Sequence, residues 1–146
     1  MINDRVIAEN PLASHLTPAR QAGPFSLAIF GASGDLTKRK LIPALFNLYK
    51  DGFLAAPFTI IGFARKEKSD DSFRGEMAQA ILKFSRRRPD SDDQLNRFVA
   101  GLSYVQGEFH DEAAFAKLGD KLKHATLARH SAHNRLFYLA TPPAAF

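Results

Sequence analysis

Two glycines, Gly31 and Gly34, separate a short apolar run at residues 27–30 from a segment with helical spacing that begins at Asp35. Glycine permits the tight turn that a strand needs when it passes directly into a helix. The backbone N–H groups of such a turn, together with the positive end of the helix dipole, attract an anion. The pattern therefore predicts that this junction binds a phosphate group.

The residues around these glycines distinguish two kinds of phosphate-binding loop. A Walker loop requires Lys after its last glycine, whereas Asp35 follows Gly34 here. A dinucleotide-binding loop usually reads G-x-G-x-x-G, and this chain keeps the tight turn at Gly31 but has Thr37 in place of the last glycine. We expect the Asp35 carboxylate to cap the helix, with its backbone N–H facing the ligand. We expect Lys38, in the first helical turn, to contact phosphate.

Arg65 follows a second apolar run, residues 58–63, and is the other residue that indicates a ligand. Folds that prefer NAD place Asp or Glu at the end of the second strand, where the carboxylate holds the ribose 2′-hydroxyl. A cation at this place suits the 2′-phosphate of NADP instead. A solvated arginine at the end of a strand is the alternative, and Glu67, two residues further on, complicates the local charge.

The elements that would position these residues alternate between strands and helices. Apolar and β-branched runs predict strands at residues 25–30, 58–63, 103–106 and 136–140. Helical spacing of apolar residues predicts helices at about 35–50, 71–87, 94–100 and 112–123. Pro43 should bend the first helix or displace its start. This order predicts an α/β fold, a Rossmann-type doubly wound parallel sheet, and right-handed crossovers predict the strand order 3-2-1-4.

The two ends of the chain lead to different expectations. Several prolines interrupt any periodicity before Phe25, so we expect residues 1–24 to form a flexible N-terminal arm. At the other end, Thr141 and Pro142 suit the start of a helix that the chain does not continue. We therefore expect residues 25–146 to be a partial NADP-binding Rossmann domain, incomplete at the C-terminus, from a longer protein. A frayed natural tail is the alternative.

Composition restricts the compartment and the chemistry. The 146 residues include no cysteine, which excludes disulfides and fits a reducing compartment. No apolar run reaches membrane-spanning length and the N-terminus lacks a secretory signal, so we expect a cytoplasmic protein with no membrane partner. The five histidines have no metal-ligand spacing and no Ser-His-Asp pattern is readable. We therefore assign no metal site and no catalytic residue.

The net charge of +5 favours anionic partners such as nucleotides, although solubility alone would also explain it. The run Arg86-Arg87-Arg88 could contact nucleic acid. More often, such a run is the charged end of a helix, where the helix dipole favours cations. We therefore expect no nucleic-acid partner.

Beyond these patterns, four segments resemble one known family. Residues 29–54 read IFGASGDLTKRKLIPALFNLYKDGFL and closely resemble the N-terminal region of glucose-6-phosphate dehydrogenases. Residues 61–65 (IGFAR), 104–107 (YVQG) and 134–143 (NRLFYLATPP) resemble it too, in matching order and spacing. The resemblance runs from about residue 27 to the last residue, and its motifs are highly specific.

The resemblance implies an NADP-dependent enzyme that oxidises D-glucose 6-phosphate to 6-phospho-D-glucono-1,5-lactone, the first step of the oxidative pentose phosphate pathway. It also implies that Arg65 binds the 2′-phosphate of NADP and that one loop binds its other phosphates. The residues of that loop are Gly31, Ala32, Ser33, Gly34, Asp35, Leu36, Thr37 and Lys38. Two positions depart from the family: Phe146 falls where many members carry tyrosine, and Thr141 falls where some carry leucine.

The substrate-binding and catalytic segments of this family lie further along than Phe146. We therefore expect the glucose 6-phosphate site to lie outside this chain, the chain alone to be inactive, and the full-length protein to be a homo-oligomer. Two alternatives remain at this point. One is a non-catalytic nucleotide-binding module, and the other is a different NADP-dependent reductase with a similar first half.

Overall fold

The computed structural model describes residues 23–54, 57–129 and 134–145. Most of the expected N-terminal arm and the position of Phe146 lie outside these described residues. Among the described residues, no helix has both the length and the apolar character needed to cross a membrane.

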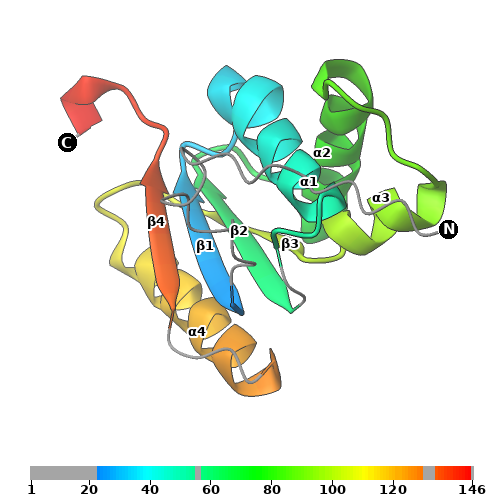
Figure 1. The fold of residues 1–146 in the computed structure, drawn as a ribbon. Helices are drawn as coiled ribbons and strands as arrows, with labels where there is room; N and C mark the ends of the chain where they lie inside the picture. The colour runs from blue at the N-terminus through cyan, green and yellow to red at the C-terminus, as the bar shows by residue number, and fades with distance from the viewer. Residues whose placement is uncertain (1–22, 55–56, 130–133, 146) are drawn as a thin grey trace, which may run out of the picture.

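The chain forms a sheet of four parallel strands (Figure 1). The strands are β1 (Phe25–Phe30), β2 (Phe58–Ala64), β3 (Leu102–Gln106) and β4 (Arg135–Leu139). Their order is β3-β2-β1-β4, which confirms the predicted α/β fold and strand order. β1 therefore lies between β2 and β4, and the connections leave its two sides in opposite directions. Every residue of β1 is buried, as its apolar sequence predicts.

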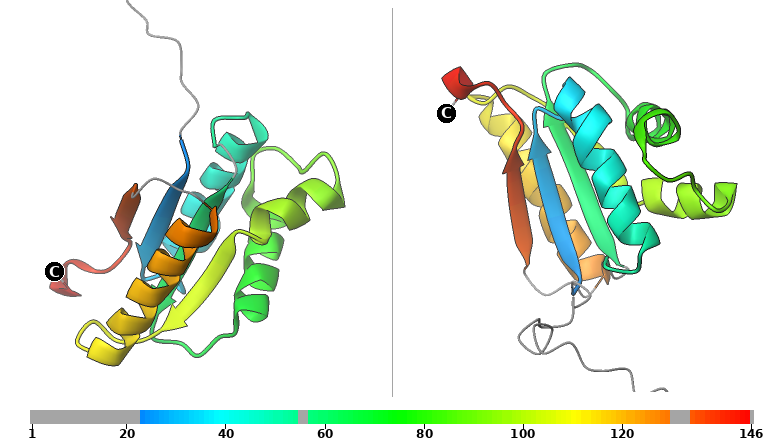
Figure 2. Two further views of the ribbon diagram at one scale, coloured as in Figure 1. Left: turned by 90° about the horizontal axis from the view of Figure 1, so that it is seen from below. Right: turned by 45° about the horizontal axis from the view of Figure 1, so that its top comes forward.

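Helices cover both faces of this sheet (Figure 2). One face carries α1 (Ile42–Lys50), α2 (Asp70–Phe84) and α3 (Asp92–Val99), and the other carries α4 (Glu112–Arg129). On the first face, Phe46, Met77 and Phe98 join Ile60 of β2 in the larger core cluster. On the second face, Leu118 of α4 joins Phe30 and Phe63 in a smaller cluster. The sheet is thus held from both sides, with its strand ends free to carry a site.

β4 is an exception to this burial. All five of its residues are exposed, and its apolar side chains Leu136, Phe137, Tyr138 and Leu139 are between 43% and 57% exposed. Phe137 still contacts Phe30, with 6.3 Å between the ring centroids. The apolar sequence of β4 is typical of a strand with both faces covered.

Two predicted helix boundaries are wrong, for different reasons. The second predicted helix continues to Arg87, whereas α2 ends at Phe84 because residues 85–88 are held by α1 instead. The Arg87 guanidinium pairs with Asp51 at 2.6 Å, and the Lys50 ammonium donates to the Arg88 carbonyl at 2.6 Å. The last predicted helix stops at residue 123, but α4 runs to Arg129, with Ala125 buried in its added turn.

The first predicted helix, residues 35–50, exists but is not regular. A π-helical turn, Thr37–Leu41, precedes α1, and the Ile42 N–H donates to the Thr37 carbonyl, five residues earlier. In a regular α-helix the ring of Pro43 would clash with the carbonyl of residue 39, and Pro43 has no N–H to donate. The wider turn directly before Pro43 relieves that conflict, in agreement with the expected distortion.

The outer edge of β3 is closed by side chains from both layers of helices. Arg74 Nε of α2 donates to the Leu102 carbonyl at 2.8 Å, and Lys121 Nζ of α4 donates to the Tyr104 carbonyl at 3.1 Å. The Tyr104 N–H donates to Asp70 Oδ1 at 2.7 Å. Asp70 also pairs with Lys121 at 3.0 Å. The carboxylate therefore joins β3, α2 and α4.

Asp70 should make stability depend on acid pH. Burial raises the pKa of its carboxyl, but the hydrogen bonds from the Tyr104 N–H and Lys121 outweigh this, so the pKa lies below its ordinary value of 3.8. The stabilisation is thus complete above the pKa of the unfolded chain and is lost as pH falls through the lower folded-state pKa. Asp70→Asn should lower the free energy of unfolding near neutral pH and flatten its fall in acid.

Urea unfolding from neutral pH to about pH 2 measures this slope. Asp71→Asn is the matched control, because the neighbouring Asp71 side chain is 95% exposed and, among the described residues, has Arg74 as its only polar partner, at 3.4 Å. A slope for Asp70→Asn as steep as that of the unaltered chain would contradict the role of Asp70.

Candidate functional site

A cleft of about 530 Å³ lies where the carboxyl ends of the four strands meet. Its volume falls in the range of small-molecule sites, roughly 300–1,000 Å³. Each strand contributes the residues that follow it, so the cleft brings together segments far apart in the sequence. The lining residues are Gly31, Ser33, Gly34, Ala64, Arg65, Gly107, Glu108, Phe109, His110, Ala140, Thr141, Pro142, Ala144 and Ala145. In parallel α/β sheets, the place where the strand order reverses is where ligands bind, and here that place is the end of β1.

The turn after β1 requires glycine at residue 31. Gly31 has φ of +83°, and a Cβ atom there would lie 2.4 Å from the Ala140 carbonyl oxygen at the end of β4. Its N–H donates to the Phe63 carbonyl at 2.9 Å, and the Gly34 N–H donates to the Gly31 carbonyl at 3.0 Å. The turn is therefore held by β2 on one side and lies against β4 on the other. Its glycines leave the backbone open to the cleft.

Two residues of the predicted phosphate-binding loop support the turn from its buried side. Ala32 is fully buried and fits against Gly62, where an added Cβ would lie 2.8 Å from the Ala32 Cβ. Thr37 is also fully buried, and its hydroxyl donates to the Gly31 carbonyl at 3.4 Å. Neither lines the cleft, so the structure assigns them to the scaffold of the loop.

Asp35 and Leu36 form the exposed first turn of the helix. The prediction that the Asp35 carboxylate caps this helix is wrong, since it makes no hydrogen bond with any described residue. The reason is positional: Asp35 is already the first helical residue, one position after the N-cap residue, whose side chain accepts hydrogen bonds from N–H groups two or three residues further along the helix. Its negative charge at a helix N-terminus remains favourable.

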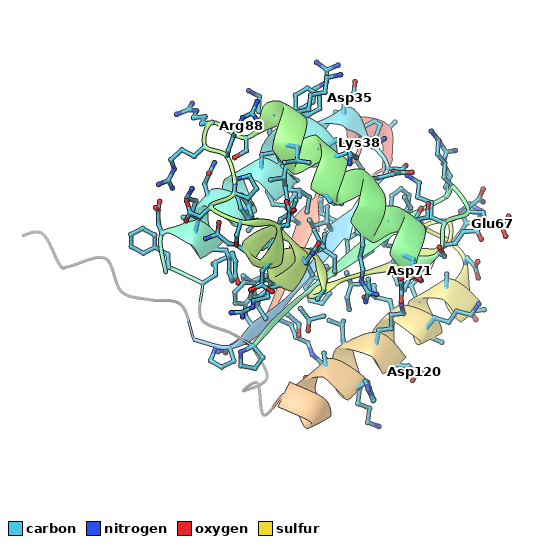
Figure 3. The ribbon with its side chains drawn as sticks, turned by 90° about the vertical axis from the view of Figure 1, so that its right-hand side faces the viewer. Asp35, Lys38, Glu67, Asp71, Arg88 and Asp120 are labelled. Carbon is cyan, nitrogen blue, oxygen red and sulfur yellow. The ribbon has the colours of Figure 1, made fainter. Side chains whose placement is uncertain are left out.

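Lys38 lies beside α2 and not among the residues that line the cleft (Figure 3). Its Nζ is 3.8 Å from the Glu76 carboxylate, which also accepts a hydrogen bond from Lys68 Nζ at 2.5 Å. The Lys68 side chain is only 8% exposed. Glu76 therefore holds two lysines on the α2 side of the loop.

Arg65 lies at the cleft directly after β2, as predicted. It is exposed, and no carboxylate of a described residue lies within ion-pair distance of its guanidinium. Glu67, which complicated the sequence pattern, lies on the outside of the same loop and makes no such pair (Figure 3). An unpaired guanidinium at a ligand cleft is suited to bind a phosphate or carboxylate.

The segment after β3 was missed as part of the site. Gly107, Glu108, Phe109 and His110 line the cleft, and His110 Nε2 lies 3.0 Å from Glu108 Oε2. An added Cβ at Gly107 would lie 2.1 Å from the Ala114 Cβ, so α4 packs directly against this turn. The strand prediction contained the necessary signal, because it ended at residue 106 and the ends of parallel strands share one edge.

Comparison with known proteins identifies the family. Residues 28–146 match the family model described as "Glucose-6-phosphate dehydrogenase, NAD binding domain". The chain belongs to the glucose-6-phosphate dehydrogenase family. This confirms the resemblance found in the sequence. The matched part is the domain of glucose-6-phosphate dehydrogenases that binds the dinucleotide, which agrees with a cleft at the reversal point of the sheet.

Individual relatives support this assignment. The glucose-6-phosphate 1-dehydrogenase of Chlamydia pneumoniae is 44% identical over 131 residues, which are 90% of this chain and 25% of that protein. The chloroplastic glucose-6-phosphate 1-dehydrogenase of Nicotiana tabacum is 38% identical, over 83% of this chain and 20% of its own length. A solved structure of glucose-6-phosphate dehydrogenase in complex with its substrate glucose-6-phosphate has a TM-score of 0.76 and 31% identity, covering 89% of this chain and 27% of that one. The chain thus spans about a quarter of the length of these relatives.

Gly31→Ala should destabilise the domain through two separable costs. Placing a side chain at positive φ costs about 1–2 kcal/mol, and the overlap with Ala140 adds about 1–3 kcal/mol. Gly52→Ala is the matched control, because Gly52 has φ of +78° but open space around its Cβ position. Chemical denaturation should therefore give a clearly larger loss of unfolding free energy for Gly31→Ala. Equal losses for the two variants would argue against the close approach to β4.

Proposed function

We propose that this chain binds NADP in the cleft at the carboxyl edge of the sheet. The observation that carries the proposal is the unpaired, exposed guanidinium of Arg65 at the end of β2. In doubly wound folds, the residue at this position contacts the ribose 2′-hydroxyl of NAD or the 2′-phosphate of NADP. Membership of a family whose matched part is an NAD binding domain supports a dinucleotide as the ligand.

In this proposal the loop at residues 31–38 binds the pyrophosphate. Ser33 offers its backbone N–H group at the cleft, whereas the Gly34 N–H is used by the turn itself, where it donates to the Gly31 carbonyl. Gly31 and Gly34 carry no side chain and let the phosphate oxygens approach the backbone closely. Ala32 and Thr37 contribute by fixing the turn, and Asp35 and Leu36 contribute only backbone groups. Lys38 would have to leave Glu76 to reach a phosphate, so its contact depends on a side-chain movement.

We propose that the whole protein is a glucose-6-phosphate dehydrogenase. It would oxidise D-glucose 6-phosphate to 6-phospho-D-glucono-1,5-lactone, with hydride transfer to NADP, as the first step of the oxidative pentose phosphate pathway. This chain would supply cofactor binding only, and by itself it would be inactive. Support comes from the family match and from the complex of a structural neighbour with glucose-6-phosphate.

The activity test uses the complete gene product. It should produce NADPH with glucose 6-phosphate, measured by the absorbance of the reduced nicotinamide, and much less with other sugar phosphates. NADPH formation only with a different sugar phosphate would favour another NADP-dependent reductase. A folded protein that binds NADP but reduces it with no sugar phosphate would favour a non-catalytic nucleotide-binding module.

Location and assembly are part of the same proposal. The absence of cysteine supports a cytoplasmic enzyme. The exposed apolar side chains of β4 support burial of that strand in the whole protein. We propose a homo-oligomer, which light scattering of the purified gene product would test.

Arg65→Ala should weaken binding of NADP much more than binding of NAD. Charge-assisted contacts to phosphate contribute roughly 1.5–3 kcal/mol, which corresponds to about a 10- to 150-fold loss for NADP alone. Calorimetric titration with both cofactors measures this. Arg97→Ala is the control and should change neither affinity, because Arg97 is an exposed arginine on α3 whose only ion-pair partner among the described residues is Asp93. Equal losses of NADP and NAD for Arg65→Ala would refute the role given to Arg65.

A further inference from the structure

The loop that carries Arg65 is fastened to β3 through a series of consecutive backbone carbonyls. The Ala64 carbonyl accepts a hydrogen bond from the Gly107 N–H at 2.9 Å, and this is a backbone hydrogen bond at the ends of β2 and β3. The next two carbonyls, of Arg65 and Lys66, accept side-chain hydrogen bonds from β3. Gln106 Nε2 donates to the first at 3.2 Å, and the Tyr104 hydroxyl donates to the second at 2.6 Å. The hydrogen-bonded pairing of β2 with β3 is thereby continued past the end of β2 by side chains.

The far end of this loop is fastened to α2. Lys68 Nζ donates to the Glu76 carboxylate at 2.5 Å, and Ser69 then accepts the Ser72 N–H as the N-cap of α2. A loop normally leaves such groups to water. Here residues 65, 66 and 68 each have a protein partner, and the partners lie on β3 and α2.

The Arg65 guanidinium has none of these contacts. Its backbone is fixed while its side chain is exposed at the cleft and pairs with no carboxylate of a described residue. A cation whose backbone is already ordered loses less conformational entropy when it binds an anion. The arrangement therefore orders the loop before the ligand arrives.

We propose that Tyr104 and Gln106 of β3 are positioning residues that hold Arg65 for recognition of the nucleotide 2′-phosphate. The inference rests on the proposed function, because it assigns these residues to the same 2′-phosphate site. The preference for a 2′-phosphate would then depend on Tyr104 and Gln106 of β3 as well as on Arg65.

Tyr104 is well suited to this role. Its ring is buried and packs on Phe73, with 5.2 Å between ring centroids, so the direction of the hydroxyl is fixed. Burial raises the pKa of the hydroxyl, and the negative charge of Glu76 raises it further. The hydroxyl is therefore protonated at physiological pH and can donate to the Lys66 carbonyl.

The test compares two probes that differ only in the 2′-phosphate: 2′,5′-ADP and 5′-AMP. Calorimetric titration of the full chain gives both affinities for the unaltered protein and for Tyr104→Phe, Gln106→Ala and Arg65→Ala. Tyr104→Phe keeps the ring and removes only the hydroxyl. It should weaken 2′,5′-ADP by roughly three- to tenfold, in line with the loss of one hydrogen bond, and leave 5′-AMP within about twofold. Gln106→Ala, at an exposed side chain that does not disturb the core, should act in the same direction.

Tyr49→Phe is the matched control. Tyr49 is a half-buried tyrosine packed against Phe46 and Phe98, and its hydroxyl makes no hydrogen bond with a described residue. Its variant should leave both affinities unchanged. Hydrogen exchange gives a second readout: the amides of residues 65–68 should exchange faster in Tyr104→Phe and not in Tyr49→Phe.

The outcomes separate the inference from the proposal beneath it. If Arg65→Ala lowers the preference for 2′,5′-ADP and neither Tyr104→Phe nor Gln106→Ala does, the positioning role is wrong and the proposed function stands. Equal weakening of both probes by Tyr104→Phe and Gln106→Ala also overturns it, since that indicates general damage to the cleft. If Arg65→Ala leaves the preference unchanged, the assignment of the 2′-phosphate to Arg65 fails, and the positioning role fails with it.

Discussion

The approach of the Gly31 backbone to the end of β4 is the constraint on which the site depends. The Gly31 turn contacts three strands at once. It continues β1, its N–H donates to the Phe63 carbonyl of β2, and it lies against the Ala140 carbonyl at the end of β4. No side chain fits between these backbones. Because the turn is closed in this way, the helix after it begins at the cleft, and the ends of all four strands face one ligand volume. Thr37 and Ala32 then reinforce the turn from the buried side.

Much of the fold could be read from the sequence because its strands are short, apolar and separated by helical spacing. The parallel sheet and its order follow from local patterns and from the handedness of crossovers. The errors lie where contacts between distant residues decide. α2 ends early because Asn47, Lys50 and Asp51 of the α1 end bind residues 85–88, and no pattern within α2 records that. α4 runs further because one added turn buries Ala125.

The site was partly predictable for the same reason. Glycine spacing and the strand-end position indicated Gly31, Gly34 and Arg65, and all three line the cleft. The predicted capping role of Asp35 is wrong because the helix begins at Asp35 itself, one residue earlier than a cap at Asp35 requires. The pairing of Lys38 with Glu76 was not readable, since these residues are far apart in sequence and meet only when the π-helical turn Thr37–Leu41 packs on α2. The hydrogen bonds from Tyr104 and Gln106 depend on the register of β3 beside β2, which sequence alone does not fix.

The closed edge of β3 has a consequence for how this sheet can be extended. Arg74, Asp70 and Lys121 occupy backbone groups that an incoming strand would need, so nothing can pair there without displacing an ion-paired network. β4, at the opposite side, pairs with β1 among the described strands and presents exposed apolar side chains. Further strands are therefore expected to add at the β4 edge of the sheet and not at the β3 edge. Among the described strands, a new strand, from the same polypeptide or from another molecule, can pair with β4 but meets the ion-paired network at β3.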